Sequence, residues 1–489
     1  MFARLLKDQW IPLACAGFVL LNGLFMANEI YWLNLLPAAL LIGWAMVAHV
    51  ESVLLFIVFA TPLSLNLEQM ELGGIGVAVP TEPLMVSIML LFLLKLGLEH
   101  DVLDPRVWRH PVTLVIILQL AWMAFCIIPS SMPLVSLKYL AARGWFVCTM
   151  YFMATRLFER PRNMQRFAWL YMTGLVIVIG YTLIRHAGFR FEHDPAHWVM
   201  EPFFKDHTSY GAIIAFFLPF SVTAISLPGA SVGRRALAVA FLIILVLGMV
   251  LSYTRAAWVG VVAALGAMLV MRLRIPGWLV LGVTVLAGGL YLVNRDQITI
   301  ALERNRDESS DDLAKHVSSI SNISSDASNL ERINRWNSAL RMFEERPWTG
   351  WGPGTYMFQY APFQAAADRT IISTNFGLGG NAHSEFLGPL SEQGLPGALI
   401  VAVLIAVTTW TAVRLWQRMP QGADRRMVGA ALFGLITYYV HGTLNNFLDL
   451  DKASVPFWGF TAMIVVMDLR YPARRASAQP LAMSLEPRA

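Results

Sequence analysis

The sequence contains little charge and little cysteine for its length. Of its 489 residues, 14% are charged and three are cysteines, whereas 56% are hydrophobic and the mean hydropathy is +0.56. This shortage of charge excludes an ordinary soluble domain, in which about a quarter of the residues are charged. Cys15, Cys126 and Cys148 all lie in apolar runs. We therefore expect them to be buried packing residues rather than disulfides or metal ligands.

Several motifs that signal catalysis or transport are missing. The sequence has no P-loop, no paired-cysteine metal site and no HExxH zinc motif, because His383-Ser-Glu lacks the second histidine. It also has no internal repeat of the kind found in many transporters. We therefore expect no metal and no cofactor. The missing repeat disfavours a transporter without excluding one.

Apolar runs of membrane-spanning length recur along most of the chain. They predict an all-α polytopic membrane protein with about fourteen spans, or twelve if the short third run and the Pro-rich region 76–90 do not cross. The predicted spans are 10–27, 31–49, 52–66, 82–98, 111–129, 131–155, 166–185, 208–226, 235–252, 255–272, 276–293, 396–416, 427–444 and 455–470.

Lysine and arginine are unevenly distributed between alternate connections. If the N-terminus is cytoplasmic, about 21 of them fall on the cytoplasmic side and about five in the short connections opposite. This topology accounts for the net charge of +5, so we expect no nucleic-acid partner. It divides the chain into a helical block (1–293), a large external loop with short helices (294–395), closing spans (396–470) and a cytoplasmic, disordered tail (471–489).

The external loop carries signs of its own fold. Ser328 and Glu331 form a capping-box signature at the start of a helix that Pro347 ends. A glycine-rich turn, Trp348-Thr-Gly-Trp-Gly-Pro-Gly354, follows. The expected apolar stripe of the helix consists of Ile333, Trp336, Leu340 and Phe343.

His383 stands where the chain re-enters the membrane after this loop. A neutral histidine suits proton removal from a hydroxyl group. The alternative is a loop histidine that caps the next helix or bonds a carbonyl. Glu385 either orients His383 or binds sugar hydroxyls, although at helical spacing its side chain would point elsewhere.

Cationic residues occur on the same external side or within predicted spans. Arg255 lies in a very short external connection, where it either binds an anion or reaches the interface as an ordinary snorkelling arginine. Arg143 lies about a dozen residues into a predicted span, which is costly unless it faces a cavity or a partner. Lys138 can reach the interface. His207 opens another span and is either an interfacial residue or a catalytic one.

Arginine and histidine together fit one class of reaction. Arginine forks bind phosphate oxygens and keep their charge at every accessible pH. Such cations stabilise a diphosphate leaving group without a metal, while a histidine deprotonates the attacking hydroxyl. The residues therefore fit group transfer from a lipid diphosphate to an acceptor hydroxyl outside the cytoplasm.

At these positions the chain resembles the bacterial O-antigen ligase and polymerase superfamily, over roughly residues 205–450. The matching pieces are Thr254-Arg-Ala-Ala, Arg332-x-x-x-Trp336-x-x-Ala-Leu340, Arg346-Pro-Trp-Thr-Gly-Trp-Gly-Pro-Gly354 and His383-Ser-Glu-Phe-Leu-x-x-Leu-x-Glu392-x-Gly394. Ser384 replaces the usual asparagine and Thr254 the usual serine, which leaves the roles of these two positions open.

The resemblance implies an inverting, metal-independent glycosyltransferase with a GT-C-like fold in the bacterial inner membrane, its active site facing the periplasm. The donor would be a glycan on undecaprenyl diphosphate. The acceptor would be lipid A–core oligosaccharide in a ligase, a second lipid-linked repeat in a polymerase, or a protein hydroxyl. A transporter of lipid-linked sugars is the remaining alternative. All of these act among membrane lipids.

The resemblance also assigns residues. His383 would be the catalytic base, and Arg255 and Arg332 would bind the diphosphate. We add Arg143 and Arg335 to the diphosphate site from their burial and proximity in the sequence. Glu385, Lys138 and His207 complete the expected site as supporting residues.

Overall fold

The computed structural model describes residues 2–66, 76–99, 101–277, 279, 282, 286, 327–370, 373 and 380–472. The chain divides into two compact units, Met1–Phe56 and Ile57–Ala489. The first unit contains α1 (Phe2–Ala27), a 3₁₀ turn (Trp32–Leu35), α2 (Leu36–Ala48) and the start of α3 (Val50–Ala60). The predicted span 276–293 lies almost entirely outside the described residues, as does the tail beyond residue 472.

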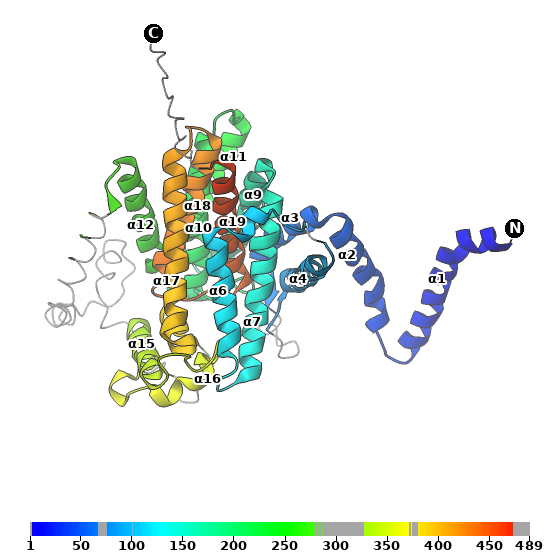
Figure 1. The fold of residues 1–489 in the computed structure, drawn as a ribbon, viewed down its shortest axis with the longest axis horizontal. Helices are drawn as coiled ribbons and strands as arrows, with labels where there is room; N and C mark the ends of the chain where they lie inside the picture. The colour runs from blue at the N-terminus through cyan, green and yellow to red at the C-terminus, as the bar shows by residue number, and fades with distance from the viewer. Residues whose placement is uncertain are drawn as a thin grey trace, which may run out of the picture. The chain divides into compact units, whose positions relative to one another are not determined.

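The second unit is a bundle of helices (Figure 1). Its apolar sequence runs form α4 (Thr81–Leu98), α5 (Pro105–Trp108), α6 (Pro111–Cys126), α7 (Pro133–Val147), α8 (Ala154–Phe158), α9 (Pro161–Ala187), α10 (His207–Ser226), α11 (Val232–Leu251), α12 (Arg255–Arg272), α17 (Leu387–Arg418), α18 (Ala423–His441) and α19 (Asp451–Arg470). A π-helical segment, Cys148–Met153, joins α7 to α8. Two short strands, β1 (Leu65–Asn66) and β2 (Ala78–Val79), pair antiparallel.

The segment between α12 and α17 contributes α15 (Ala327–Glu345), α16 (Tyr356–Gln359) and the 3₁₀ turns Ala361–Phe363 and Ala366–Asp368. A further 3₁₀ turn, Asp194–His197, lies between α9 and α10. In Figure 1, α15 and α16 lie where α17 begins, and α15 contacts α17. We call this the loop end of the bundle. The predicted helix that begins near Ser328 and ends before Pro347 is confirmed by α15.

Close helix packing positions the loop end. A Cβ at Gly260 on α12 would approach the Thr437 carbonyl oxygen at 2.6 Å, and one at Gly434 on α18 would approach the Phe216 carbonyl oxygen at 2.7 Å. Glycine at these positions therefore allows α18 to pack directly against α12 and α10. The turn after α18 is held in this way beside the starts of α10 and α12.

The all-helical membrane architecture is confirmed, with fewer candidate spans among the described residues than the sequence predicts for the whole chain. Seven described helices are long and apolar enough to cross a membrane, or up to eight if the pair Trp32–Ala48 and Val50–Leu63, bent by 115°, counts as one span. Among the described residues, Pro111–Cys126 is short and α18 begins with charged residues. The expected span 131–155 is one helical run from Pro133 to Phe158, in which Cys148–Met153 is π-helical.

The three cysteines are free, and Cys126 and Cys148 are buried as expected. The expectation was wrong for Cys15, which is exposed on α1. Most neighbouring described side chains of α1 are exposed as well, so nothing in that helix provides a buried environment.

A buried network fixes the start of α19. The Asp451 carboxylate accepts hydrogen bonds from the hydroxyls of Ser64 and Thr81. Lys452 Nζ donates to Ser64 Oγ at 2.7 Å and lies 3.3 Å from Asp451 Oδ1. This network ties the end of α3 and the start of α4 to the start of α19, close to the turn that reaches the candidate site.

Candidate functional site

His383 lies in a tightly turned segment, residues 380–386, which we call the His383 loop. The backbone of His383 has φ +48°, in the left-handed region that a histidine rarely adopts. Its N–H donates to Asn381 Oδ1 at 3.1 Å, and its carbonyl accepts from Trp336 Nε1 at 3.3 Å. Further along, the Glu385 N–H donates to the Gly442 carbonyl at 2.7 Å. The loop is therefore held between α15 and the turn after α18.

The surroundings of His383 keep its ring neutral. Burial, together with the nearby cations Arg335 and Arg332, lowers the pKa of His383 to about 4. Asn445, by a side-chain hydrogen bond, and the carboxylate of Asp206 oppose this shift. The structure thus brings His383, Arg332 and Arg335 together, as expected from the sequence.

Asn445 connects two histidines. Its side chain hydrogen-bonds the His383 ring, and its Nδ2 lies 3.1 Å from His441 Nε2. With Nδ2 donating to His441, the Asn445 carbonyl oxygen can accept from a ring N–H of His383, which leaves the other ring nitrogen as a base. Asp206, Asn445 and His441 did not emerge as site residues from the sequence.

The starts of α10 and α12 also reach this group. Thr254 Oγ1 donates to the His207 carbonyl at 2.7 Å, which joins the residue before Arg255 to the first residue of α10. Asp206 caps α10 by accepting from the Ser209 N–H at 2.8 Å. The charges of Asp206 and Arg332 both act on His207. Arg255 is the first residue of α12 and is half-buried. The N-terminal starts of α10 and α12 therefore place His207 and Arg255 on the same side of the His383 loop as the His383 ring.

Arg335 makes internal contacts that hold the His383 loop. Its Nε donates to Glu331 Oε1 at 2.8 Å and its Nη1 to the Asn381 carbonyl at 3.2 Å. A Cβ at Gly380, where φ is +100°, would lie 1.8 Å from Arg335 Nη1. Burial would raise the pKa of Glu331, but hydrogen bonds from Ser373 and Arg335 lower it overall. Arg335 therefore supports the loop as an ion-paired residue.

The prediction that an apolar stripe (Ile333, Trp336, Leu340 and Phe343) forms the buried face of α15 was wrong. Its described buried residues are Glu331, Asn334, Arg335, Ser338, Ala339 and Met342. Leu340 is instead 41% exposed. The helix turns its polar face inward because the buried ion pair and the Asn334 side chain, which donates to Gln364 Oε1 at 2.8 Å, are satisfied there.

The glycine-rich turn docks on a kink in α17. Gly394 has φ +70° inside that helix, and a Cβ there would meet the Trp348 carbonyl oxygen at 2.3 Å. The N–H groups of Gly354 and Tyr356 both donate to the Glu392 carboxylate, at 2.9 Å each. Glu392 of the His383 motif therefore holds the turn, which explains why the two motifs occur together.

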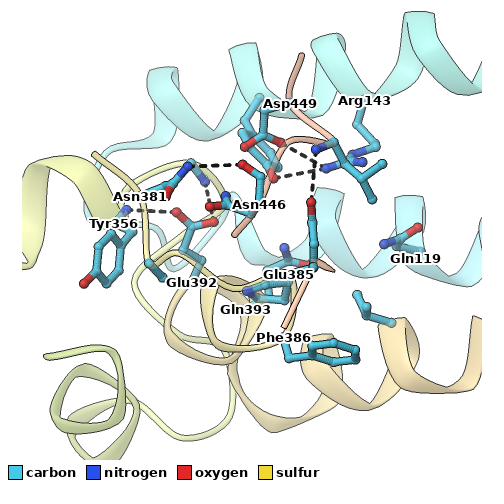
Figure 2. A pocket seen from close by; sticks show the side chains of 18 of the residues that line it. Gln119, Arg143, Tyr356, Asn381, Glu385, Phe386, Glu392, Gln393, Asn446 and Asp449 are labelled. Carbon is cyan, nitrogen blue, oxygen red and sulfur yellow. Dashed lines mark hydrogen bonds and ion pairs between the residues drawn. The ribbon is translucent and has the colours of Figure 1, made fainter. Parts of the chain in front are cut away.

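A cavity of about 350 Å³ lies on the other side of the His383 loop. Gly380, Asn381 and Ala382 of the loop line it, together with residues of α6, α7, α17, α18 and α19. Arg143 projects into it, and its Nη2 donates to Asp449 Oδ1 at 3.1 Å (Figure 2). The expectation that Arg143 faces a cavity and a partner is thus met, although the structure places it with carboxylates instead of with Arg332.

Glu385 belongs to this second region. Its Oε1 accepts from Tyr438 Oη at 2.6 Å and from the N–H groups of Phe447 and Leu448 at 2.9 and 3.0 Å. Burial raises its pKa, and the nearby Asp449 adds to the rise. Glu385 lines the cavity and fixes the turn after α18.

The expected site residues therefore form two groups that share the His383 loop. His383, Arg332, Arg335, His207 and Arg255 belong to one side, and Arg143 and Glu385 to the other. Lys138 is exposed on α7 and does not line the cavity. Within the described ranges, no group of three or more His, Cys, Asp or Glu side chains has the geometry to hold a metal ion.

Comparison with known proteins bears on the first group. Residues 239–402 match the family model described as O-Antigen ligase. This stretch includes Arg255, Arg332 and His383 but not Arg143. No curated protein matches the chain. The resemblance drawn from the motifs is confirmed over residues 239–402, where this multi-pass membrane chain is similar to the O-antigen ligase family.

Proposed function

We propose that the protein is an inverting glycosyltransferase of the O-antigen ligase type. It moves a glycan from undecaprenyl diphosphate to a hydroxyl of lipid A–core oligosaccharide at the periplasmic face of the bacterial inner membrane. The observation that carries this proposal is the neutral His383, held on a strained turn beside Arg332 and hydrogen-bonded to Asn445. A general base next to a fixed cation is what hydroxyl attack on a diphosphate-linked sugar requires.

In the proposed step, the free ring nitrogen of His383 takes the proton of the acceptor hydroxyl. The hydroxyl oxygen forms a bond to the anomeric carbon while the bond from that carbon to the diphosphate oxygen breaks. Undecaprenyl diphosphate leaves with the electron pair, and attack from the opposite face inverts the anomeric centre. Asp206 stabilises the positive charge that develops on His383, because its carboxylate favours the protonated ring.

Arg332 and Arg255 bind the leaving diphosphate in this proposal. Guanidinium groups match phosphate oxygens in pairs and keep their charge as the leaving group gains its own. Arg335 acts as a positioning residue, because its contacts to Glu331 and the Asn381 carbonyl already occupy much of its hydrogen-bonding capacity. His207 supports the same side of the site through the start of α10.

Transfer in vitro tests this function. Purified wild type, His383→Ala and Arg255→Ala receive undecaprenyl-diphosphate glycan and lipid A–core in the presence of EDTA. Loss of a general base costs about 10²- to 10⁴-fold in rate, so we expect transfer by wild type and almost none by His383→Ala. The matched control is Arg234→Ala, which removes an exposed arginine from the start of α11 and should transfer at the wild-type rate.

The products separate the alternatives. Glycosylated lipid A–core identifies a ligase, whereas a lengthened lipid-linked glycan without lipid A–core product identifies a polymerase. A glycosylated protein identifies a protein transferase. If no product forms and a folded His383→Ala variant functions as wild type in cells, the catalytic proposal fails and transport of lipid-linked sugars takes its place.

A further inference from the structure

The cavity behind the His383 loop contains polar groups whose hydrogen-bonding capacity is unused. Among the described residues, two buried donors in its lining have no partner, Arg143 Nη1 and Trp458 Nε1. Two buried acceptors in the same lining, Gln119 Oε1 and Asn446 Oδ1, also have none. Buried polar atoms are nearly always paired, so four unpaired atoms around one cavity indicate a missing ligand.

These groups come from separate elements that are firmly held. Arg143 is only 6% exposed and Trp458 is fully buried. The Asn446 carbonyl accepts from Asn381 Nδ2 at 3.2 Å, which ties the turn after α18 to the His383 loop. Trp122 Nε1 on α6, three residues from Gln119, donates to the Gln393 carbonyl at 3.0 Å. The arrangement is therefore built in advance.

The chemistry of the lining selects a class of ligand. Two donors and two acceptors match hydroxyl groups, each of which both donates and accepts. Three carboxylates (Asp449, Glu385 and Glu392) line the cavity against two cations (Arg143 and Lys205), a balance that disfavours a diphosphate. Phe457, Trp458 and Leu404 supply an apolar wall, as in most small-ligand sites.

We propose that this cavity is a sugar-binding subsite, which holds one uncharged sugar residue through Arg143, Trp458, Gln119 and Asn446. This inference rests on the proposed function, because it assigns the sugar to a substrate of glycan transfer. The cavity volume of about 350 Å³ lies at the lower end of the range for ligand pockets, about 300–1,000 Å³. Since Asn381 and Ala382 line the cavity, a bound sugar lies directly behind the loop that carries His383.

Two sources can supply such a sugar, namely the lipid-linked donor glycan and the lipid A–core acceptor. Asp449, which lines the cavity, has a side chain that is 41% exposed, so the cavity is reached from outside the protein. The experiment therefore includes both compounds as separate arms.

Protection of an introduced thiol measures binding without catalysis. Met357 lines the cavity, is 37% exposed and contributes none of the four unpaired atoms. Met357→Cys is made together with Cys15→Ser, which removes the exposed native thiol and leaves Cys126 and Cys148 buried. In phospholipid nanodiscs, the rate of labelling by methyl methanethiosulfonate is followed with increasing octyl glucoside, donor glycan, lipid A–core or sugar-free undecaprenyl diphosphate.

We expect octyl glucoside and one of the two glycan substrates to slow labelling. Octyl phosphocholine, which has the same chain but no sugar, should not. Adding Gln119→Leu should raise the half-protecting concentration about five- to tenfold, the effect of one lost hydrogen bond. Thr408→Val is the matched control, because Thr408 on α17 also has an unpaired buried oxygen among the described residues but does not line the cavity.

Two results would overturn the proposal. Equal protection by sugar-free undecaprenyl diphosphate would make the cavity a diphosphate or isoprenoid site and return Arg143 to the role first expected of it. Failure of every compound to protect would mean that the cavity holds only water. The assay is repeated in His383→Ala, where protection should persist because His383 does not line the cavity. If the wild type transfers no glycan but protection is still observed, the proposed function is contradicted and the sugar subsite stands.

Discussion

Asp449 and Asp451 are two residues apart in the same turn, yet their surroundings differ. The Asp451 side chain is 3% exposed and meets two hydroxyls, a lysine and the Lys452 N–H at 2.8 Å. The Asp449 side chain is 41% exposed and meets Arg143, whose second terminal nitrogen has no partner among the described residues. The cluster around Asp451 is therefore complete, and we call it the closed cluster. The cluster around Asp449 has an unused donor, and we call it the open cluster.

The difference indicates what each cluster is for. A buried charge is tolerated only when its partners satisfy it, and the cluster around Asp451 meets this condition without any ligand. The cluster around Asp449 leaves donor capacity unused beside a cavity. The complete set of partners therefore indicates a structural role for Asp451 and Lys452. The unused donor beside the cavity indicates a binding role for Asp449 and Arg143.

The largest expected effect comes from breaking the closed cluster. Lys452→Met leaves Asp451 buried without its cation, which should lower the free energy of unfolding by about 3–5 kcal/mol. Thermal unfolding of the purified protein in detergent measures this loss. The double variant Lys452→Met/Asp451→Asn should regain much of the stability, because it leaves no uncompensated charge. A single variant as stable as wild type would contradict the structural role.

An effect of intermediate size is expected on the pH dependence of transfer through His383, where the charges of Arg332 and Arg335 oppose that of Asp206. With a pKa of about 4, His383 is neutral above that pH and loses its role as a base when it is protonated below it. The rate of transfer at limiting substrate should therefore be level through neutral pH and fall as the pH approaches 4. Arg332→Gln removes a cation that lowers this pKa, so the fall should begin at a higher pH.

The pH profile requires its own controls. Activity must return when acid-treated protein is brought back to neutral pH, which separates protonation from unfolding. Arg234→Gln, an exposed substitution on α11, should leave the profile unchanged. A wild-type rate that already falls around pH 6.5, the ordinary pKa of histidine, would contradict the low pKa of His383.

Sequence patterns predicted the helical membrane class, α15 and its end at Pro347, because apolar length and helix-end signals act locally. They predicted more spans than the described residues contain, since apolar length alone does not fix where a helix ends, as at Cys126, where α6 stops short of the expected residue 129. They also placed the buried face of α15 wrongly. The ion pair between Arg335 and Glu331 reverses the usual rule that charged residues face outward, and only tertiary contacts reveal it.

The sequence predicted which residues belong to the candidate site better than it predicted how they are arranged in space. His383, Arg332 and Arg335 were recognised from motif and position, and the structure places them together. The position of Arg143 depends on Asp449, which lies 306 residues away along the chain. No local pattern gives such a pairing. Asn445 was missed for the same reason, because its importance comes from bridging two histidines on different elements.

The smallest expected effect tests the open cluster. Asp449→Asn removes the charge of a side chain that is 41% exposed, while Tyr139 Oη and the nearby Glu385 remain beside the buried Arg143. The loss should therefore stay close to that of an exposed ion pair, about 0–1 kcal/mol. Thermal unfolding should therefore change little, in contrast to Lys452→Met, although the two positions are three residues apart. The substitution keeps an oxygen that can accept from Arg143, so that Arg143 stays in place beside the cavity. A loss of stability as large as that of Lys452→Met would mean that both clusters are structural, and the contrast between a closed and an open cluster would disappear.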